Sequence, residues 1–378
     1  MSKALPNEIG RVMVTSGAGD YPVIVGPGTT SGLPSLLLSL AAPRRVAMIT
    51  DSHVGPLYAD ALAATCRAES LDVEVFQFEA GEASKTRKTW ATLTDQMLEA
   101  GMGRDTVVVS VGGGVSTDLA GFVAATFLRG VPVVQVPTSY LAMIDASVGG
   151  KTGVDVRAGK NLIGAFHPPL AVVIDTTLLE TLPVAERAQG LVEALKHGAI
   201  RDESYFDALI GDLGALLAAE PIRAAEVVLS SVRIKAEIVG QDERESGVRQ
   251  ILNFGHTIGH AMEAASSYGL GHGAAVAMGM KGEAAVGEAL GVTQAGTRRR
   301  LDDALAPLLN VAGEDPRWIA STLDVDSVMS FLCKDKKARA GRPRFVLLEQ
   351  IGTVAAGKGW THAIPSDLVQ DSVLGATQ

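Results

Sequence analysis

The chain has 378 residues, of which 20% are charged and 47% are hydrophobic, and its formal net charge is −9. This length favours about two domains, and the acidic balance argues against nucleic acid or an anionic membrane surface as the main partner. No apolar run is long enough to cross a bilayer, and the first residues lack the apolar stretch of a signal peptide. Two distant cysteines, Cys66 and Cys333, fit a reducing compartment, so we expect a cytoplasmic protein without a disulfide framework.

The first half of the chain alternates strand-like and helical patterns. Short runs rich in β-branched residues predict strands at residues 46–50, 73–77, 106–111 and 133–136. Helical segments at residues 57–66 and 87–99 separate the first three of them. This order predicts an α/β domain, with a parallel sheet and helices on its faces.

A glycine cluster follows the third of these strands. Gly112, Gly113 and Gly114 precede a helical stretch, and glycines there allow a pyrophosphate to approach the backbone at a helix N-terminus. The match to a dinucleotide-binding fingerprint is imperfect, because Thr117 stands where a third glycine is expected. Asp51, just past an earlier strand, could accept hydrogen bonds from a ribose. A tight strand-to-helix turn without a ligand is the alternative.

The segment from Gly149 to Gly153 resembles a P-loop only superficially. Asp145 occupies the place of the first required glycine, and no helical pattern follows Thr152. What remains is a glycine-rich loop that carries Lys151 and is followed by Lys160 and Asn161. Such a loop suits an anionic ligand, and a solvated hairpin is the competing interpretation.

Beyond residue 182 the pattern becomes helical, and strands nearly vanish until residues 345–348. We therefore predict two domains, residues 1–182 and 183–378. On a predicted helix over residues 184–200, Glu193, Lys196 and His197 share one face. Lys235 lies on an otherwise apolar stripe, so its ammonium group needs a partner or an anionic ligand.

Three of the seven histidines lie close together in the second half. Asn253, His256, His260 and Glu263 fall at i, i+3, i+7 and i+10, so they would share one face of a helix, and His272 follows shortly after. Imidazole is the commonest metal ligand, and the i, i+4 spacing suggests two ligands from one helix. Ordinary helix histidines with internal partners are the alternative.

Taken together, the motifs resemble the 3-dehydroquinate synthase family over almost the whole chain. The segments that carry this resemblance are residues 81–85, 112–121, 129–130, 136–138, 145–153, 159–166, 193–196, 253–260 and 271–273. The resemblance implies an N-terminal Rossmann-like domain, a C-terminal helical metal-binding domain and a site in the cleft between them.

The family resemblance also implies a metal site and a reaction. The ligands of Zn²⁺ or Co²⁺ would be Glu193, His256 and His272, which leaves His260 as a substrate-binding group. Such enzymes convert 3-deoxy-D-arabino-heptulosonate 7-phosphate to 3-dehydroquinate and phosphate, a step of the shikimate pathway of aromatic amino-acid biosynthesis. The sequence of steps is oxidation, phosphate elimination, reduction, ring opening and aldol closure, with NAD⁺ taking the hydride and later returning it.

By resemblance, one set of residues would bind the anionic sugar phosphate and another the cofactor. The substrate set comprises Arg129, Asp145, Lys151, Lys160, Asn161, Lys196, Lys235, Arg249, Asn253, His260 and Lys336, with Asp145, Lys151, Asn161, Lys196 and His260 in catalytic roles. The cofactor set comprises Asp51, Glu82, Lys85, Gly114, Val115, Ser116, Thr117, Asp118, Thr138, Ser139, Lys151, Lys160, Leu178 and Thr181. Arg129 would reach the phosphate of a neighbouring subunit, which implies a homodimer.

Four positions depart from the common family pattern, namely Thr117, Ser139, Asp155 and His197. None of them removes a charged catalytic group, so we expect activity to persist. They leave room for an aminodehydroquinate synthase or another sugar-phosphate cyclase. More remote alternatives are a metal-dependent polyol-phosphate or alcohol dehydrogenase, and a non-catalytic dinucleotide-binding protein on the same scaffold.

Overall fold

The computed structural model describes residues 4–157, 159–314, 319, 323–334, 343–357 and 359–376. The chain divides into two compact units, Met1–Leu182 with Ala219–Gly240 and Pro183–Ala218 with Gln241–Gln378. The sequence pattern predicts a single division after residue 182, whereas in the structure the chain returns to the first unit for helix α7 (Pro221–Gln241). No helix in these described ranges combines the length and the apolar character needed to span a membrane.

A seven-stranded sheet forms the centre of the first unit, in the order β1-β2-β9-β6-β5-β3-β4. The strands are β1 (Gly10–Val14), β2 (Tyr21–Gly26), β3 (Arg45–Asp51), β4 (Asp72–Phe78), β5 (Thr106–Gly112), β6 (Val133–Pro137) and β9 (Ala171–Asp175). Only β1 and β2 pair antiparallel; the other neighbours in this sheet are parallel. The four predicted strands are confirmed as β3 to β6, and the α/β fold class is confirmed with them.

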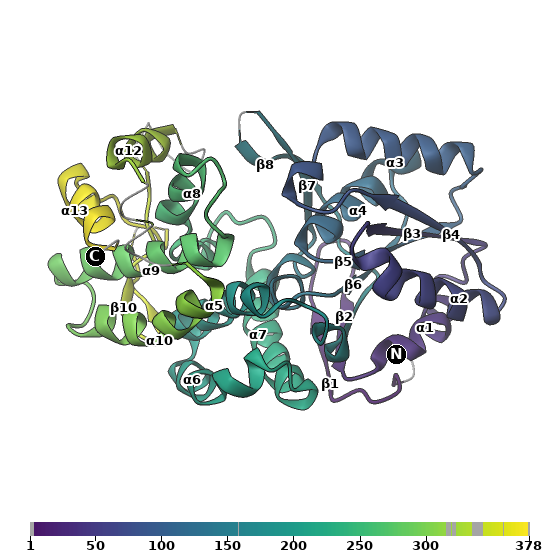
Figure 1. Ribbon diagram of the computed structural model, residues 1–378, viewed down its shortest axis with the longest axis horizontal. Coiled ribbons are helices and arrows are strands. Elements are labelled where there is room, and N and C mark those ends of the chain that lie inside the picture. The colour runs from purple at the N-terminus through teal and green to yellow at the C-terminus, as the bar shows by residue number, and fades with distance from the viewer. Residues whose placement is uncertain are drawn as a thin grey trace. The chain divides into compact units, whose positions relative to one another are not determined.

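Helices cover both faces of this sheet because its inner strands are apolar on both sides. The helices are α1 (Leu33–Leu40), α2 (Asp60–Ala68), α3 (Arg87–Glu99) and α4 (Gly114–Thr126). Figure 1 shows α3 and α4 on one side of the sheet and α1 and α2 on the other. Ile49, Phe76 and Val108 of the sheet pack with Leu93 and Leu119 in one buried core, on the side of α3 and α4.

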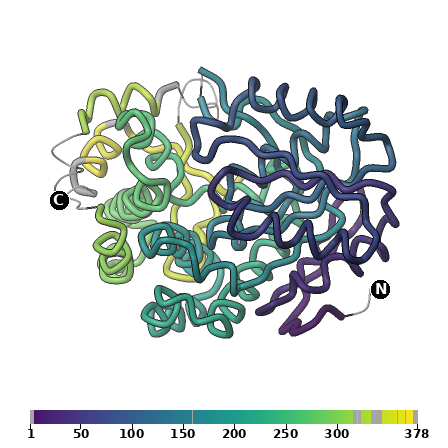
Figure 2. The backbone as a smooth tube through the Cα atoms, turned by 45° about the vertical axis from the view of Figure 1, so that its right-hand side comes forward, coloured from purple at the N-terminus to yellow at the C-terminus, as the bar shows by residue number. Residues whose placement is uncertain are grey.

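The strand order reverses next to β3. This strand lies between β4 and β5, so the chain crosses it on the way from one neighbour to the other; the winding can be followed through the blue part of the tube in Figure 2. Ligands of such sheets bind outside the carboxyl ends of the strands at the point of reversal. The carboxyl ends of β3, β4 and β5 are therefore where a cofactor is expected.

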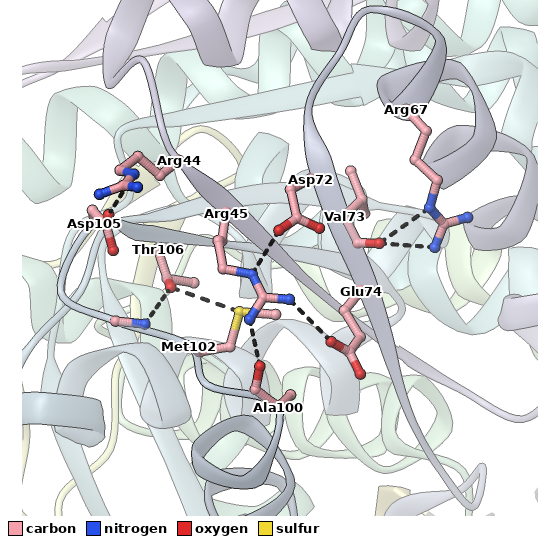
Figure 3. Close-up of polar contacts among 11 residues, drawn as sticks. Arg44, Arg45, Arg67, Asp72, Val73, Glu74, Ala100, Met102, Asp105 and Thr106 are labelled. Carbon is pink, nitrogen blue, oxygen red and sulfur yellow. Dashed lines mark hydrogen bonds and ion pairs between the residues drawn. The ribbon is translucent and has the colours of Figure 1, made fainter.

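At the amino ends of the strands, opposite the end where a cofactor is expected, β3 forms ion pairs with β4 (Figure 3). Arg45, the first residue of β3, donates to Asp72 at 2.8 Å and to Glu74 at 3.3 Å, and it also donates to the Ala100 carbonyl after α3. These contacts hold the amino ends of β3 and β4 against the end of α3. These contacts are structural. They involve none of the residues at the carboxyl ends of the strands, where a ligand is expected.

The glycine-rich segment around Lys151 forms a separate antiparallel hairpin, β7 (Lys151–Val156) and β8 (Gly159–Phe166). Thr152 lies within β7 and no helix follows it directly in the described residues, as the sequence pattern predicts. Asp155 accepts a hydrogen bond from the Asn161 amide at 2.7 Å across the turn. The segment is therefore a hairpin, and ligand binding by its lysines stays a prediction.

The second unit is mainly helical. Its elements are α5 (Val184–Arg201), α6 (Glu203–Leu217), α8 (His256–Ala265), α9 (His272–Ala289), α10 (Thr297–Ala312), α12 (Val325–Lys334), α13 (Ser366–Ala376) and the short pair β10 (Leu348–Gln350) and β11 (Thr353–Val354). The strand predicted at residues 345–348 begins later, since Phe345 makes only an isolated bridge to His362. Helix α9 is buried on nearly all sides, as expected of a central helix.

Close packing of α8 against α9 depends on glycine. Gly255 precedes α8 with φ +78, and a Cβ there would lie 2.6 Å from Met280 Cγ and 2.7 Å from the Val276 carbonyl oxygen. This left-handed residue begins α8 at His256, so Asn253 lies in a preceding 3-10 turn. The prediction that Asn253 shares the helix of His256 is therefore wrong, because the glycine interrupts the helical path.

We expect Gly279→Ala to destabilise the fold of the second unit. A Cβ at position 279 would overlap with the carbonyl oxygen of Gly255, so the two helices must move apart, at a cost of about 1–3 kcal/mol. Gly211→Ala is the matched control, because its Cβ meets nothing within 4 Å and alanine favours a helix. Thermal unfolding should show opposite signs for the two variants; equal stability would contradict the packing argument.

Candidate active site

The second unit brings together one carboxylate and two imidazoles from three helices. Glu193 comes from the middle of α5, His256 from the first residue of α8 and His272 from the first residue of α9. One ligand atom from each lies within 4.8 Å of the others. The Nε2 atoms of both histidines are 3.6 Å from the same oxygen, Glu193 Oε1. These are the three residues that the family resemblance assigns to the metal.

The two oxygens of the Glu193 carboxylate have different neighbours. Oε1 faces the histidines, whereas Oε2 pairs with the ammonium of Lys196, one turn further along α5. Burial would raise the pKa of Glu193, but Lys196 and the histidines hold it well below its ordinary value. Glu193 is therefore an ionised carboxylate, completely buried, with one oxygen directed at the imidazoles.

The spacing of these atoms fits a divalent cation. A tetrahedral ion bound to nitrogen and oxygen at ordinary zinc distances separates the two ligand atoms by about 3.4 Å, close to the 3.6 Å found here. The Nδ1 atom of His256 lies 3.2 Å from the Phe254 carbonyl oxygen. A hydrogen bond there fixes the tautomer with Nε2 free to bind metal. The donor set of one carboxylate and two imidazoles suits Zn²⁺ or Co²⁺.

His272 lies between two carboxylates. Its Nε2 faces Glu193, and its Nδ1 is 3.5 Å from Glu263 Oε1. Although burial favours the neutral imidazole, Glu193 and Glu263 raise the pKa of His272 to about 9. The two carboxylates next to this ring therefore favour a positive charge at this place, and a bound metal cation would be favoured for the same reason.

Three further residues of the predicted substrate set lie in the second unit. His260 is exposed on α8, with its ring centroid 5.2 Å from that of His256 and 6.2 Å from that of His272. Asn253 donates to Glu245 at 2.5 Å, and the buried Arg249 donates to the Glu243 carbonyl at 2.5 Å. His260 is thus next to the proposed metal ligands, while Asn253 and Arg249 occupy the turn that leads into α8.

In the first unit, most residues of the predicted cofactor set follow the carboxyl ends of the parallel strands. Asp51 is the last residue of β3, and the others follow β4 (Glu82, Lys85), β5 (Gly114, Val115, Ser116, Thr117, Asp118), β6 (Thr138, Ser139) and β9 (Leu178, Thr181). The amide groups of α4 begin directly after β5, where a helix N-terminus favours a phosphate. The structure thus gathers these residues at the edge where a dinucleotide is expected.

Several side chains at this edge already have partners within the unit. Asp51 accepts hydrogen bonds from the His53 and Val54 amides at 2.9 Å and from the Ser116 hydroxyl at 3.0 Å. The Thr117 hydroxyl donates to the Gly114 carbonyl at 3.0 Å and is buried. Ser116 and Thr117 can therefore meet a cofactor through the backbone better than through their hydroxyls.

Lys85 also has a partner within the first unit, the Asp118 carboxylate. Its ammonium contacts Asp118 at 2.5 Å, and the residue is only 4% exposed. Although burial disfavours its charge, the Asp118 and Glu82 carboxylates raise the pKa of Lys85. Lys85 is thus a fixed cation that holds the N-terminal part of α4 against the loop after β4.

The partner that Lys235 requires is Asp145. The Lys235 ammonium contacts the Asp145 carboxylate at 2.6 Å and its carbonyl oxygen at 2.5 Å. Lys235 is 5% exposed, whereas the Asp145 side chain is 30% exposed. The buried lysine therefore anchors an accessible carboxylate, and the prediction that it needs a partner is confirmed.

The remaining residues of the predicted substrate set in the first unit are exposed or half-buried. Lys151 is exposed at the start of β7, and Lys160, near the start of β8, pairs with Glu82 at 3.7 Å. Asn161 has φ +52 and Arg129 has φ +72, both left-handed conformations that are uncommon outside glycine. Lys336, the last member of the predicted substrate set, lies outside the described residues.

Two carboxylates near the metal ligands were not assigned roles from the sequence. Glu263 was placed only on the face of His256 and His260, although its 2% exposure and its contact with His272 give it a specific place. Glu283 of α9 accepts the Gly255 amide at 2.8 Å and so holds the start of α8. The charged residues inside the otherwise apolar helix α9 were the available signal for Glu283.

Comparison with solved structures identifies the architecture. 2-Deoxy-scyllo-inosose synthase, solved with carbaglucose-6-phosphate, NAD⁺ and Co²⁺, superposes with a TM-score of 0.86 at 24% identity, covering 97% of this chain and 99% of that one. 2-epi-5-epi-Valiolone synthase from Streptomyces hygroscopicus, solved with NAD⁺ and Zn²⁺, gives 0.84 at 28% identity, covering 97% and 99%. The fold of this chain is that of these two synthases.

Sequence comparison is more specific. Family models for the N-terminal and C-terminal parts of 3-dehydroquinate synthase match residues 75–189 and 190–338. The 3-dehydroquinate synthase of Symbiobacterium thermophilum is 43% identical over 335 residues, which cover 88% of this chain and 92% of that protein. With both family models matched in order and this identity over most of its length, the chain belongs to the 3-dehydroquinate synthase family.

Proposed function

We propose that this protein is a 3-dehydroquinate synthase, a phosphate-eliminating lyase that forms 3-dehydroquinate from 3-deoxy-D-arabino-heptulosonate 7-phosphate. The observation that carries this proposal is the convergence of Glu193, His256 and His272 in a chain of this family. We also propose a cytoplasmic location, which suits the free, buried thiol of Cys66.

Each absent group would supply one kind of chemistry. A divalent cation held by Glu193, His256 and His272 would lower the pKa of a substrate hydroxyl and bind its oxygen. NAD⁺ at the carboxyl edge of the first unit's sheet would accept a hydride and return it, so no net oxidation would accumulate. Relatives of the same fold have been solved with NAD⁺ and with Co²⁺ or Zn²⁺, which supports both assignments.

The protein's own side chains would orient the substrate. Lys196 is 1% exposed and paired with Glu193, so it fixes the carboxylate that faces the imidazoles. Asp145, held by Lys235, presents an accessible acceptor for substrate hydroxyls. Lys151 and Arg129, both exposed, would pair with the anionic groups of a carboxylated sugar phosphate. Positioning of this kind supplies a large part of the barrier reduction in multistep catalysis.

We further propose that the active enzyme is a homodimer in which Arg129 binds the phosphate of the partner's substrate. Arg129 is exposed and follows Leu128, whose φ is +48, so two consecutive non-glycine residues hold left-handed conformations. Such strain costs about 1–3 kcal/mol per residue and is typical of functional loops. We infer that this loop holds an unfavourable backbone conformation in order to position the Arg129 side chain.

Arg129→Ala is expected to lower kcat/KM by roughly 10- to 100-fold, because a charge-assisted contact to phosphate contributes about 1.5–3 kcal/mol. Co-expression with a Glu193→Gln chain should restore activity to about one quarter of wild type, since half of randomly assorted dimers contain one complete site out of two. Arg44→Ala, a change at a side chain that is 85% exposed, is the matched control. Activity equal to the sum of the two parents would contradict sharing across the dimer.

The activity itself is tested by phosphate release from 3-deoxy-D-arabino-heptulosonate 7-phosphate, with catalytic NAD⁺ and Zn²⁺ and with NADH absorbance followed in parallel. Stoichiometric phosphate without accumulated NADH is the expected result. Phosphate released only from an amino-substituted analogue or another sugar phosphate would reassign the substrate within the cyclases. Net NADH with a simple alcohol would instead identify a dehydrogenase.

A further inference from the structure

The two imidazoles of the proposed metal site are oriented in different ways. His256 has its Nδ1 next to the Phe254 carbonyl, a neutral group two residues away in the same turn. His272 has its Nδ1 3.5 Å from Glu263 Oε1, a carboxylate supplied by the other helix, α8. One ring is thus positioned by its local backbone, and the other depends on a distant charged side chain.

Glu263 is well placed to act on His272 alone. It lies seven residues after His256 on α8, which puts both side chains on the same face of that helix. Its side chain is 2% exposed, and a carboxylate is retained at such burial only when it is paired or hydrogen-bonded. His272, like His256, is the first residue of its helix, and the Glu263 carboxylate is the group that lies against its Nδ1.

We propose that Glu263 is a positioning residue that accepts the Nδ1 proton of His272 and thereby directs its Nε2 toward the metal. The inference rests on the proposed metal site, and it adds a fourth, non-coordinating residue to it. A carboxylate behind a metal-binding histidine fixes the tautomer, restrains the ring and increases the basicity of the coordinating nitrogen.

A different arrangement has to be distinguished from this one. His260, Glu263 and His272 also place ligand atoms within 4.8 Å of one another, so Glu263 could itself be a ligand on the Nδ1 side of the ring. The burial of the residues favours the Nε2 side: Glu193 is completely buried and shared by both histidines, whereas His260 is exposed. With the ion on the Nε2 side of the His272 ring, Glu263 contacts the Nδ1 side and orients the ring.

The test is the affinity and stoichiometry of Zn²⁺ and Co²⁺ in Glu263→Gln and Glu263→Met, measured by competition with a chromophoric chelator. Removing such an orienting carboxylate typically weakens metal binding about 10- to 100-fold. We expect this loss for Glu263→Met and a smaller one for Glu263→Gln, which keeps an acceptor oxygen. The stoichiometry should stay at one ion per chain, and the Co²⁺ absorption spectrum should keep its wild-type shape, because the ligand atoms are unchanged.

Matched variants separate this inference from the proposed function. Glu288→Gln changes a carboxylate of the same helix α9 that caps the Arg298 amide, about 24 Å along the helix from His272, and should bind metal as wild type does. His272→Ala should lose the ion. Wild-type affinity in both Glu263 variants, with loss in His272→Ala, would overturn the positioning role and leave the metal site intact.

Two further outcomes are decisive. An altered Co²⁺ spectrum with loss of stoichiometric binding in Glu263→Gln would make Glu263 a ligand and overturn the positioning role. Wild-type binding in His272→Ala as well as in the Glu263 variants would overturn the ligand set and the inference together. If Glu263→Met does not fold, judged by circular dichroism, the Glu263→Gln variant alone decides between these results.

Discussion

Replacing Glu193 with glutamine is expected to remove most of the bound divalent cation and, with it, turnover. Glutamine keeps the shape of the side chain but removes the charge that faces both imidazoles. Loss of a residue that only supports a metal ligand typically weakens metal binding about 10- to 100-fold, and we expect a larger loss when a ligand itself loses its charge. Metal content after dialysis and phosphate release under limiting Zn²⁺ are the measurements.

The same substitution affects stability, so a control is needed. Without Glu193, the Lys196 ammonium, which is 1% exposed, loses its counter-ion. Circular dichroism at the assay temperature therefore has to show that the variant is folded before its metal content is compared. Glu186→Gln, an exposed change in the first turn of the same helix, should retain wild-type metal and activity. Full metal content in Glu193→Gln would remove this residue from the ligand set.

Local patterns in the sequence account for much of the first unit. The runs that form β3, β4, β5 and β6 are short and rich in β-branched residues, and all but β4 are almost wholly buried. Strands of this kind can be recognised without tertiary information. Strand β9 (Ala171–Asp175) has the same character but was not singled out. The antiparallel strand β1 was also missed, because its exposed and half-buried residues give a weak pattern at the edge of a sheet.

Long-range placement could not be predicted from these patterns. Helix α7 is helical in its sequence, yet nothing in its periodicity shows that it packs with the first unit. The Asp145 partner of Lys235 lies 90 residues away, and the Asp118 partner of Lys85 lies 33 residues away. Such pairs are set by the topology of the sheet, so the need for a partner was predictable and its identity was not.

In the metal site, too, the local pattern could be predicted from the sequence and the long-range contacts could not. The polar face of α8 was visible from the spacing of His256, His260 and Glu263. The left-handed Gly255, which separates Asn253 from that face, could have been suspected only from the glycine itself. That Glu193 and His272 come from two other helices follows from family resemblance and from the fold, since spacing along the sequence favoured the pair on α8.

Lys85→Met is expected to lower the free energy of unfolding by about 3–5 kcal/mol, because it leaves the Asp118 carboxylate in a buried site without its cation. The raised pKa of Lys85 fixes how this effect depends on pH. The stabilisation is fully present below the ordinary pKa of lysine and is lost as the pH rises through the folded-state value. The difference from wild type should therefore shrink in strongly alkaline solution. It should also shrink in acid, because burial raises the pKa of Asp118 despite Lys85, and protonation of Asp118 removes the charge that Lys85 neutralises.

A double variant separates loss of the pair from loss of packing. Lys85→Met combined with Asp118→Leu removes both charges, and replacing both members of a buried pair costs much less than removing one. We expect the double variant to recover most of the lost stability but to bind NAD⁺ poorly, because Asp118 lies near the N-terminus of α4 at the proposed cofactor end of the sheet. Lys88→Met, at an exposed position of α3, is the matched control and should unfold like wild type. Denaturant unfolding that ranks Lys85→Met with Lys88→Met would show that the pair holds neither the loop nor the helix, and Lys85 would then be available to the cofactor directly.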